Sequence, residues 1–313
     1  MIDIYLTDEQ ENLIKKDELV KGCWINLTRP SEFEIQKIVK GTDIPRDFIS
    51  DPLDDDERSR IEKEDDKVLI IVDFPVPVRD ESDSAPYDTI PLGIIVTPQY
   101  FVTVCLQSNP IVEDFIHDKV RNFFTYKKTR FTLQILYAIA RYYLKYLRTI
   151  DRRTAMIERE LRESMRNKEL YDLLSLEKTL VYFTTSLKAN NIVMEKMMKQ
   201  RFLRMYDDDQ DLLEDVIIEI KQAIEMSEVH SNILSGMMDA YASVISNNVN
   251  VVMKFLTTIT IVLSIPTMVA SFYGMNVKGI PGVAFPHAFW IPFFVALVLS
   301  GITALIFWKK RYF

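Results

Sequence analysis

The chain has 313 residues, 48% of them hydrophobic, and a formal net charge of -7. This length allows one large domain or two ordinary ones, and the negative charge argues against a nucleic-acid partner. The two cysteines, Cys23 and Cys105, are too few for a disulfide framework or a zinc site, which fits a reducing compartment.

The first 125 residues alternate short β-branched runs with polar connections. Three such runs predict strands: 68–72, 94–97 and 101–106. Three other segments are predicted to be helical: 35–40, 45–50 and 111–123. The start of the chain carries acids and no apolar run, so it predicts no signal peptide. We therefore expect a cytosolic α/β domain over residues 1–125, in a fold of the α+β class.

Two heptad series follow, and they predict long helices. The first series comprises Leu133, Leu136, Ala140, Tyr143, Leu147, Ile150, Ile157 and Leu161. The second comprises Leu173, Leu176, Leu180, Phe183, Leu187, Met194 and Met197. This spacing predicts two antiparallel helices that pack as a coiled coil over residues 126–205.

A third, longer helix is predicted after the acidic run 207–211, which supplies a break and a helix cap. No proline occurs between this run and Pro266, so one helix can continue from about residue 212 into the apolar C-terminal region. Roughly 60 residues make a rod of about 90 Å, which one small domain cannot bury. We expect residues 206–254 to form a cytosolic stalk that packs against copies of itself.

Two apolar segments, 255–273 and 289–308, contain no Asp, Glu, Lys or Arg. Each is long enough to cross a hydrocarbon core of roughly 30 Å, although buried helices of a soluble core would have the same composition. Lys254 and the basic end of the chain place both ends of the pair on the cytosolic side of the plasma membrane. The predicted order is a first span (255–276), an external loop (277–288), a second span (289–308) and a basic cytosolic tail (309–313).

One face of the stalk and first span is polar. Residues spaced alternately three and four positions apart lie on one side of a helix, and here most of them are small or polar. We call this set the polar seam: Asn232, Gly236, Asp239, Ser243, Ser246, Asn250, Met253, Thr257, Thr260, Ser264, Thr267 and Ser271. The flanking positions in the span are apolar, so the seam occupies a single face. Polar groups facing lipid are costly, so these side chains face either closely packed helices or a water-filled pore. The seam alone leaves packing and pore equally open.

The first span ends in Tyr273, Gly274, Met275 and Asn276. A Gly-Met-Asn triplet that closes the first of two C-terminal spans, before a short loop and a basic tail, resembles the CorA family of Mg2+ channels. The resemblance covers the architecture of the whole chain and is closest in residues over 246–276. It favours a pore over simple packing.

The resemblance implies a funnel-shaped homopentamer in the lipid bilayer, with the first span lining the pore. Asn276 would form an outer ring of cation ligands, and Gly274 and Met275 would complete the selectivity filter. Mg2+ gives up its water reluctantly, so amide and carbonyl oxygens can hold the ion through its hydration shell. The expected cargo is Mg2+, with Co2+ or Ni2+ as further candidates.

The resemblance also assigns the rest of the pore. The expected pore-lining residues are Asp239, Ser243, Ser246, Asn250, Met253, Leu256, Thr257, Thr260, Ser264, Thr267 and Ser271. Met253 and Leu256 match the family's narrow apolar constriction, where a ring of such side chains can stop ions by dewetting. Two departures from the family pattern are Ser264, which predicts a wetter middle of the pore, and a loop with Lys278 but no acid.

A regulatory site is implied between neighbouring cytosolic domains. Asp51 and Asp215 match acidic positions at which family members bind regulatory Mg2+. Acids near runs such as 54–57 are usually solvated surface, and that reading stays open beside the sensor.

Two other functions compete with the Mg2+ channel. A Zn2+ transporter of the related ZntB type typically carries Gly-Val-Asn, and Met275 favours the Mg2+ branch. A membrane-anchored scaffold or enzyme is the other class, but the three histidines are widely separated and no phosphate loop or nucleophile motif is visible. We predict that the chain is not an enzyme.

Overall fold

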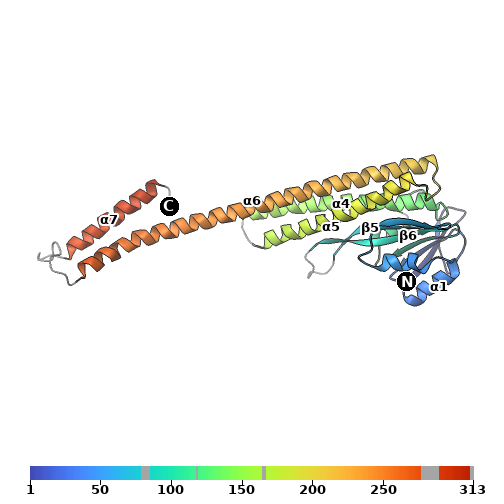
Figure 1. Ribbon diagram of the computed structural model, residues 1–313, viewed down its shortest axis with the longest axis horizontal. Helices are drawn as coiled ribbons and strands as arrows, with labels where there is room; N and C mark the ends of the chain where they lie inside the picture. Colours follow the sequence, from blue (N-terminus) through green and yellow to red (C-terminus); the bar gives the residue numbers. More distant parts are fainter. Residues whose placement is uncertain (79–84, 118, 164–166, 276–288, 311–313) are drawn as a thin grey trace. The chain divides into compact units, whose positions relative to one another are not determined.

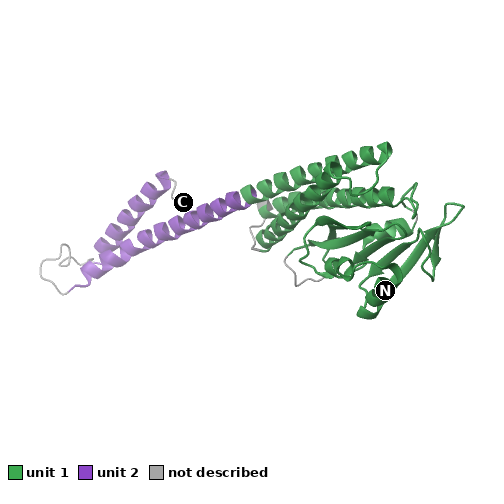
Figure 2. Ribbon diagram, turned by 45° about the vertical axis from the view of Figure 1, so that its right-hand side comes forward, with its two compact units in different colours: residues 1–236 green, residues 237–313 purple. Residues whose placement is uncertain are grey.

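The structure is a computed structural model that describes residues 1–78, 85–117, 119–163, 167–275 and 289–310 (Figure 1). It contains two compact units, Met1–Gly236 and Met237–Phe313 (Figure 2). The strands are β1 (Ile2–Thr7), β2 (Leu13–Lys16), β3 (Trp24–Thr28), β4 (Arg60–Glu64), β5 (Lys67–Pro77), β6 (Tyr87–Val96) and β7 (Phe101–Cys105). The helices are α1 (Glu32–Thr42), α2 (Arg46–Ser50), a 3-10 turn η1 (Asp51–Leu53), α3 (Pro110–Ile116), α4 (Lys128–Glu163), α5 (Asn167–Lys199), α6 (Asp207–Tyr273) and α7 (Trp290–Lys309).

The seven strands form one sheet in the order β2-β1-β3-β7-β6-β5-β4. The β3–β7 pair is parallel, and the other neighbours are antiparallel. The three predicted strands lie within β5, β6 and β7, except that residues 97 and 106 fall beyond the strand ends. The sheet is therefore larger than predicted, because β1 to β4 were not recognised in the sequence.

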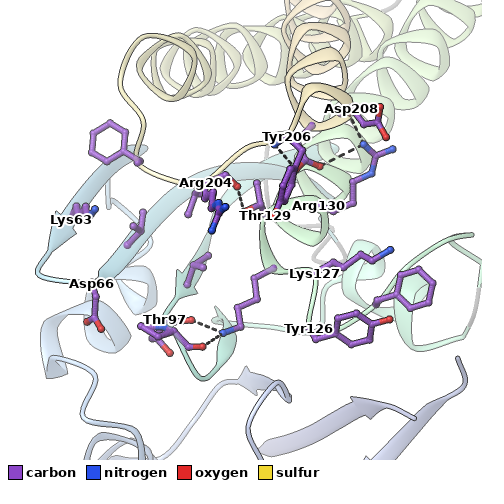
Figure 3. A pocket seen from close by; sticks show the side chains of 18 of the residues that line it. Lys63, Asp66, Thr97, Tyr126, Lys127, Thr129, Arg130, Arg204, Tyr206 and Asp208 are labelled. Atoms are coloured by element: carbon purple, nitrogen blue, oxygen red, sulfur yellow. Dashed lines mark hydrogen bonds and ion pairs between the residues drawn. The ribbon is translucent and has the colours of Figure 1, made fainter. Parts of the chain in front are cut away.

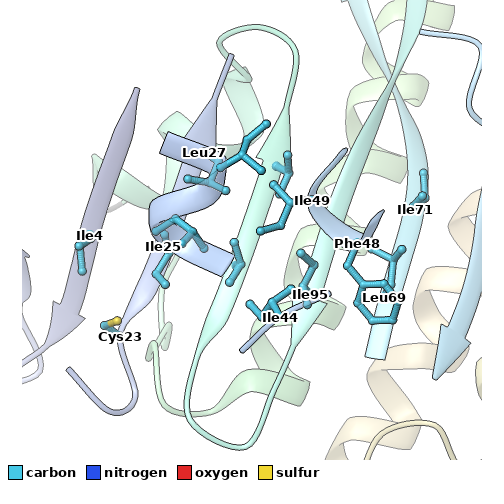
Figure 4. Packing of buried hydrophobic residues seen from close by; sticks show 14 residues of the cluster. Ile4, Cys23, Ile25, Leu27, Ile44, Phe48, Ile49, Leu69, Ile71 and Ile95 are labelled. Carbon is cyan, nitrogen blue, oxygen red and sulfur yellow. The ribbon is translucent and has the colours of Figure 1, made fainter. Parts of the chain in front are cut away.

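Alternate residues of the central strands face opposite sides of the sheet, as strand geometry requires. On one side, Ile25, Leu27, Ile71 and Val104 join residues of α1 and α2 in a buried cluster (Figure 4). On the other side, Trp24 and Phe101 pack against Phe131 of α4, with ring centroids 5.0 Å and 4.2 Å apart. The sheet thus lies between α1 and α2 on one face and α4 and α5 on the other.

The two heptad series form the interior of the helical layer. Every residue of both series is buried, with exposed fractions from 0% to 4%. Leu213, Val216, Ile220 and Ala223 of α6 are also fully buried, and Ser227 of α6 lies 2.8 Å from Thr184 of α5 through its hydroxyl. The first part of α6 therefore packs as a third helix on the coiled-coil pair.

Two predicted boundaries were wrong. The helix predicted over 111–123 ends at Ile116, and its N-terminus is capped by the Asn109 side chain. The acidic run 207–211 does not break the chain but forms the first turn of α6, while residues 200–206 make the turn between α5 and α6. Acids stabilise a helix N-terminus because they face the positive end of its dipole.

A buried amide ties α5 to the sheet. The Asn190 side chain accepts hydrogen bonds from the Asp73 backbone N–H (2.9 Å) and the Ser59 hydroxyl (3.0 Å). It also donates one to the Asp73 carbonyl at 2.7 Å, and Asn190 is fully buried. This one side chain therefore satisfies polar groups of β5 and of the segment before β4.

We expect Asn190→Ala to destabilise the cytosolic unit by about 1–3 kcal/mol, because it leaves buried hydrogen-bond groups without partners. For a unit of this size, each kcal/mol lowers the unfolding midpoint by roughly 2–4 °C. Thermal unfolding of the detergent-solubilised protein measures the shift. Asn191→Ala is the matched control, because among the described residues its amide donates to Glu195 on its own helix and does not reach the sheet. Equal shifts for both variants would contradict the assignment.

Candidate functional site

Two helices within the described residues are long and apolar enough to cross a membrane. They are α6 and α7. The most apolar 18-residue stretch of α6 has a mean hydropathy of 1.8, and 6% of this stretch is buried. The corresponding stretch of α7 has a mean hydropathy of 2.3, and none of it is buried. Exposed Leu263, Phe294 and Leu297 contribute to this surface. Apolar area on this scale needs an apolar environment, which lipid and further copies of the chain can supply.

The polar seam remains uncovered along the whole apolar part of α6. From Asp239 to Ser271, every seam residue is exposed in the single chain. A different set of positions on the same helix is covered: Thr258 is only 2% exposed, and Val262, Ile265 and Val269 are half-buried. The seam is therefore a separate face of α6 that is available to whatever lies outside this chain.

Three hydroxyls of the seam bond back to their own helix. Thr260 donates to the Leu256 carbonyl at 2.8 Å, Ser264 to the Ile261 carbonyl at 2.8 Å and Thr267 to the Leu263 carbonyl at 3.4 Å. Because each hydroxyl proton is used in this way, the oxygen lone pairs remain as acceptors. Such a face suits water molecules that donate hydrogen bonds, including those in the first shell of a cation.

Pro266 leaves a backbone carbonyl of α6 as a further acceptor, which was not predicted from the sequence. Proline has no N–H, so the Val262 carbonyl lacks its usual donor four residues later. Such free carbonyls in membrane helices are tolerated where a neighbouring group or water satisfies them. The position of Pro266 within the apolar segment was the sequence signal that could have predicted this free carbonyl.

The apolar constriction predicted on α6 is also uncovered. Met253 and Leu256 are 55% and 56% exposed, although both are large apolar side chains. They lie three residues apart, so they share one side of the helix. In a ring of copies around an axis, these side chains would narrow the space that the neighbouring polar residues line.

The helix ends at the predicted filter. The Gly274 N–H donates to the Ala270 carbonyl at 2.9 Å, and the Met275 N–H donates to the Phe272 carbonyl at 3.4 Å. Gly274 and Met275 therefore continue the helical turn after Tyr273. Asn276, the loop 277–288 with Lys278, and tail residue Arg311 lie outside the described residues.

The two predicted sensor acids have different environments. Asp51 of η1 accepts a hydrogen bond from the Arg60 guanidinium at 2.6 Å, and that guanidinium also pairs with Glu57 and Glu62. Asp215 lies on an exposed face of α6. No group of three or more His, Cys, Asp or Glu side chains suited to a metal occurs within the described part of one chain.

A cavity of about 1300 Å³ opens at the start of α4 and contains several cations, but most are already engaged (Figure 3). The Lys128 amine donates to the Thr97 and Pro98 carbonyls, both at 2.6 Å. Burial, and secondarily Lys21, lowers the pKa of Lys128 to about 8. Arg130 donates to the Asp208 carbonyl at 2.7 Å. These contacts join α4 to the loop after β6 and to the start of α6.

Comparison with known proteins agrees with this arrangement. The family model described as "CorA-like Mg2+ transporter protein" matches residues 21–311. The Cobalt/magnesium transport protein CorA of Methanocaldococcus jannaschii is 27% identical over 294 residues, which are 91% of this chain and 89% of that protein. The complete structure of CorA magnesium transporter from the same organism superposes with a TM-score of 0.86 at 25% identity, covering 100% of this chain and 99% of that one. The ZntB cytoplasmic domain from Vibrio parahaemolyticus shares the fold alone, with a TM-score of 0.61 at 11% identity over 79% of this chain and 97% of that one.

Proposed function

Because the chain belongs to the CorA-like Mg2+ transporter family, we propose that it forms a membrane channel through which hydrated Mg2+ enters the cytosol. The observation that carries this proposal is the uncovered polar face of α6, which runs through an otherwise apolar, membrane-length helix. The family is one of transporters rather than enzymes. The related CorA of Methanocaldococcus jannaschii, named for cobalt and magnesium transport, makes Co2+ a second candidate ion.

We infer that five copies surround the pore, as the resemblance to CorA channels implies. A single α6 cannot enclose a pore, whereas a ring of copies turns its polar faces inward and its apolar faces toward α7 and lipid. Both ends of the chain then lie in the cytosol, which Lys254, Lys309 and Lys310 beside the two spans support. The proposal places the large unit, Met1–Gly236, in the cytosol as well.

The seam chemistry fits a hydrated divalent ion better than a bare one. Mg2+ requires near-ideal octahedral oxygen geometry and dehydrates reluctantly, and flexible hydroxyls along a helix do not supply such a cage. Acceptor oxygens of Thr260, Ser264 and Thr267 can instead bind the water molecules around the ion. At the outer end of the pore, a ring of Asn276 side chains would select the ion through neutral amide oxygens.

The membrane potential supplies the driving force. A divalent ion gains about 4.6 kcal/mol per 100 mV, which is twice the value for one elementary charge. In cells that lack their own Mg2+ uptake, expression of the chain should restore growth at low Mg2+, and a depolarising ionophore should stop uptake. Rescue of Zn2+ uptake without Mg2+ uptake would favour the ZntB-type alternative, and no rescue of either would favour a scaffold.

We further propose that cytosolic Mg2+ closes the channel by binding between Asp51 of one subunit and Asp215 of its neighbour. Bound Mg2+ would neutralise carboxylates that otherwise repel each other. It would shift the equilibrium between the open and the closed channel only by the difference between its affinities for these two states. Arg60 weakens this site, because it already neutralises part of the charge on Asp51.

The double variant Asp51→Ala and Asp215→Ala is expected to need several-fold more cytosolic Mg2+ for both protease protection and inhibition of flux. Asp47→Ala with Asp211→Ala is the matched control, since these acids are exposed on α2, just before Asp51, and on α6, just before Asp215. If both dose-response curves of the first variant match the wild type, the sensor lies elsewhere.

A further inference from the structure

A basic groove follows α4 on the surface of the cytosolic unit. It has a volume of about 770 Å³ and is lined by α4, by the segment after α3 and by Leu212 and Glu219 of α6. Six cationic side chains line it: Lys119, Arg121, Arg130, Arg141, Lys145 and Arg148. Among the described residues that line it, the acids are Asp114 and Glu219. This concentration of positive charge stands out in a chain whose net charge is -7.

Four of these six cations form no ion pair with another residue that the structure describes. Lys119 pairs with Asp114 at 2.8 Å, and that carboxylate is further occupied by the Tyr142 hydroxyl at 2.7 Å. In contrast, no ion pair among the described residues involves the other four cations, Arg121, Arg141, Lys145 and Arg148. Arg141, Lys145 and Arg148 follow one another at steps of four and three residues, so their charges lie on one side of α4.

The same chain carries an acidic turn that lacks cations. Asp54, Asp55 and Asp56 are consecutive and exposed. The turn is ordered by its own hydrogen bonds, from the Asp54 N–H to the Asp51 carbonyl (3.1 Å) and from the Asp56 N–H to the Asp54 carboxylate (3.1 Å). No ion pair among the described residues reaches these three carboxylates, because Arg60 is occupied by Asp51, Glu57 and Glu62.

The sheet separates the two surfaces within one subunit. The acidic turn follows η1, whose Pro52 lies against Gly93 on the sheet face that α1 covers, and it leads into the edge strand β4. The groove lies on the sheet face that α4 covers. The segment between α3 and α4, which lines part of the groove, is joined to β1 by two hydrogen bonds between Thr7 and Thr125 (3.1 and 3.0 Å). Strand β1 lies near the edge of the sheet opposite β4. Figure 1 shows α1 and α4 on opposite sides of β5 and β6.

We propose that the basic groove of each subunit binds the acidic turn 54–56 of the next subunit in the assembled channel. This inference rests on the proposed function, because a pore lined by α6 brings identical cytosolic units side by side. The contact joins two different surfaces of the same chain, so it is heterologous and can close a ring around an axis. A two-fold dimer, in which the same patch meets itself, would place like charges together.

The contact has a distinct physical signature. Isolated surface ion pairs contribute little, but several arginines facing several carboxylates form a network with defined register, and arginine can bind carboxylates through two parallel hydrogen bonds. Complementary charge mainly sets specificity and orientation. Unlike a shared Mg2+ at Asp51 and Asp215, this contact needs no metal and weakens with salt, because the screening length falls from about 8 Å to about 3 Å between 0.15 M and 1 M.

Cross-linking of the full-length protein in membranes tests the contact. Cys23 and Cys105 are 0% and 2% exposed, so the wild type gives a silent background with a short bifunctional maleimide. The double variant Arg141→Cys and Asp55→Cys should give a ladder from dimer to the full ring. Each single variant should give none, because the two linked residues differ, and Arg153→Cys with Asp55→Cys is the control on another exposed position of α4.

Charge reversal supplies the second readout. Arg141→Asp with Arg148→Asp should weaken Mg2+-free association of the cytosolic units several-fold, and added Asp55→Arg with Asp56→Arg should restore it. Absence of the ladder in a protein whose wild type conducts Mg2+ would overturn the contact but not the channel. A third outcome is that inorganic phosphate abolishes the cross-linking and that charge reversal does not restore the association of subunits. This outcome would overturn the proposal and would assign the groove to a phosphate-bearing ligand instead.

Discussion

Asn276→Ala is expected to reduce Mg2+ flux to the level of empty vesicles while leaving the assembly intact. In the proposed pore, the substitution would remove an entire ring of amide oxygens, because every subunit would carry it. Hydrogen bonds to charged groups contribute about 1.5–3 kcal/mol each, and a loss of about 3 kcal/mol already slows passage more than 100-fold. The packing of α6 does not change, since Asn276 follows the last helical residue, Tyr273.

Flux in vesicles with an internal Mg2+ dye measures this effect, and size-exclusion chromatography checks assembly. Asn247→Ala is the matched control, because Asn247 is an exposed amide on α6 that does not belong to the polar seam. Cobalt hexammine, which resembles a hydrated divalent ion and cannot lose its ligands, should block the wild type from outside. Normal flux in Asn276→Ala would show that the selective ring is formed by other residues.

Glycine at Met253 or Leu256 is expected to increase Mg2+ leak through the closed channel at least several-fold. Both side chains are large, apolar and exposed on the uncovered part of α6. In the ring they would exclude water, and an ion that has lost its water finds no ligands there. Removing the side chains allows water to fill the constriction, so the barrier to a hydrated ion falls.

Flux at saturating cytosolic Mg2+ isolates this leak from ordinary opening. Val252→Gly is the matched control, because Val252 is an exposed apolar residue of the same helix outside the seam and its substitution also introduces glycine into the helix interior. If closed-state flux in Met253→Gly and Leu256→Gly equals that of Val252→Gly, the gate lies elsewhere along α6.

Hydrophobic periodicity predicted the helical part of the fold well. The heptad residues from Leu133 to Met197 are buried because coiled-coil spacing depends only on local helix geometry. The sheet was predicted less completely. Strand β1 (Ile2–Thr7) is short and its pairing is set by distant residues of β2 and β3, which the local pattern does not contain. Helix α3 likewise ends at Ile116, and Phe123 of the following segment packs against Phe131 of α4, a contact that the local pattern does not contain.

The candidate site shows the same division. The seam from Asp239 to Ser271 follows from spacing along one helix, and the structure leaves each of its residues exposed. The pairing of Asp51 with Arg60 was missed because the two residues are brought together only by η1 and β4. The basic groove was missed for the same reason, since Arg121 and Arg141 come from separate elements. Their proximity depends on the tertiary fold.

Reconstitution of the purified protein alone into liposomes tests the central claim most directly. With an inside-negative potassium diffusion potential imposed by valinomycin, the Mg2+ dye inside should respond only in liposomes that contain the protein, and removing the potential should strongly slow the response. The driving force changes by about 4.6 kcal/mol per 100 mV for a divalent ion. Potential-driven Mg2+ entry from this single component is the result predicted here, and vesicles that remain as tight to Mg2+ as protein-free liposomes would contradict it.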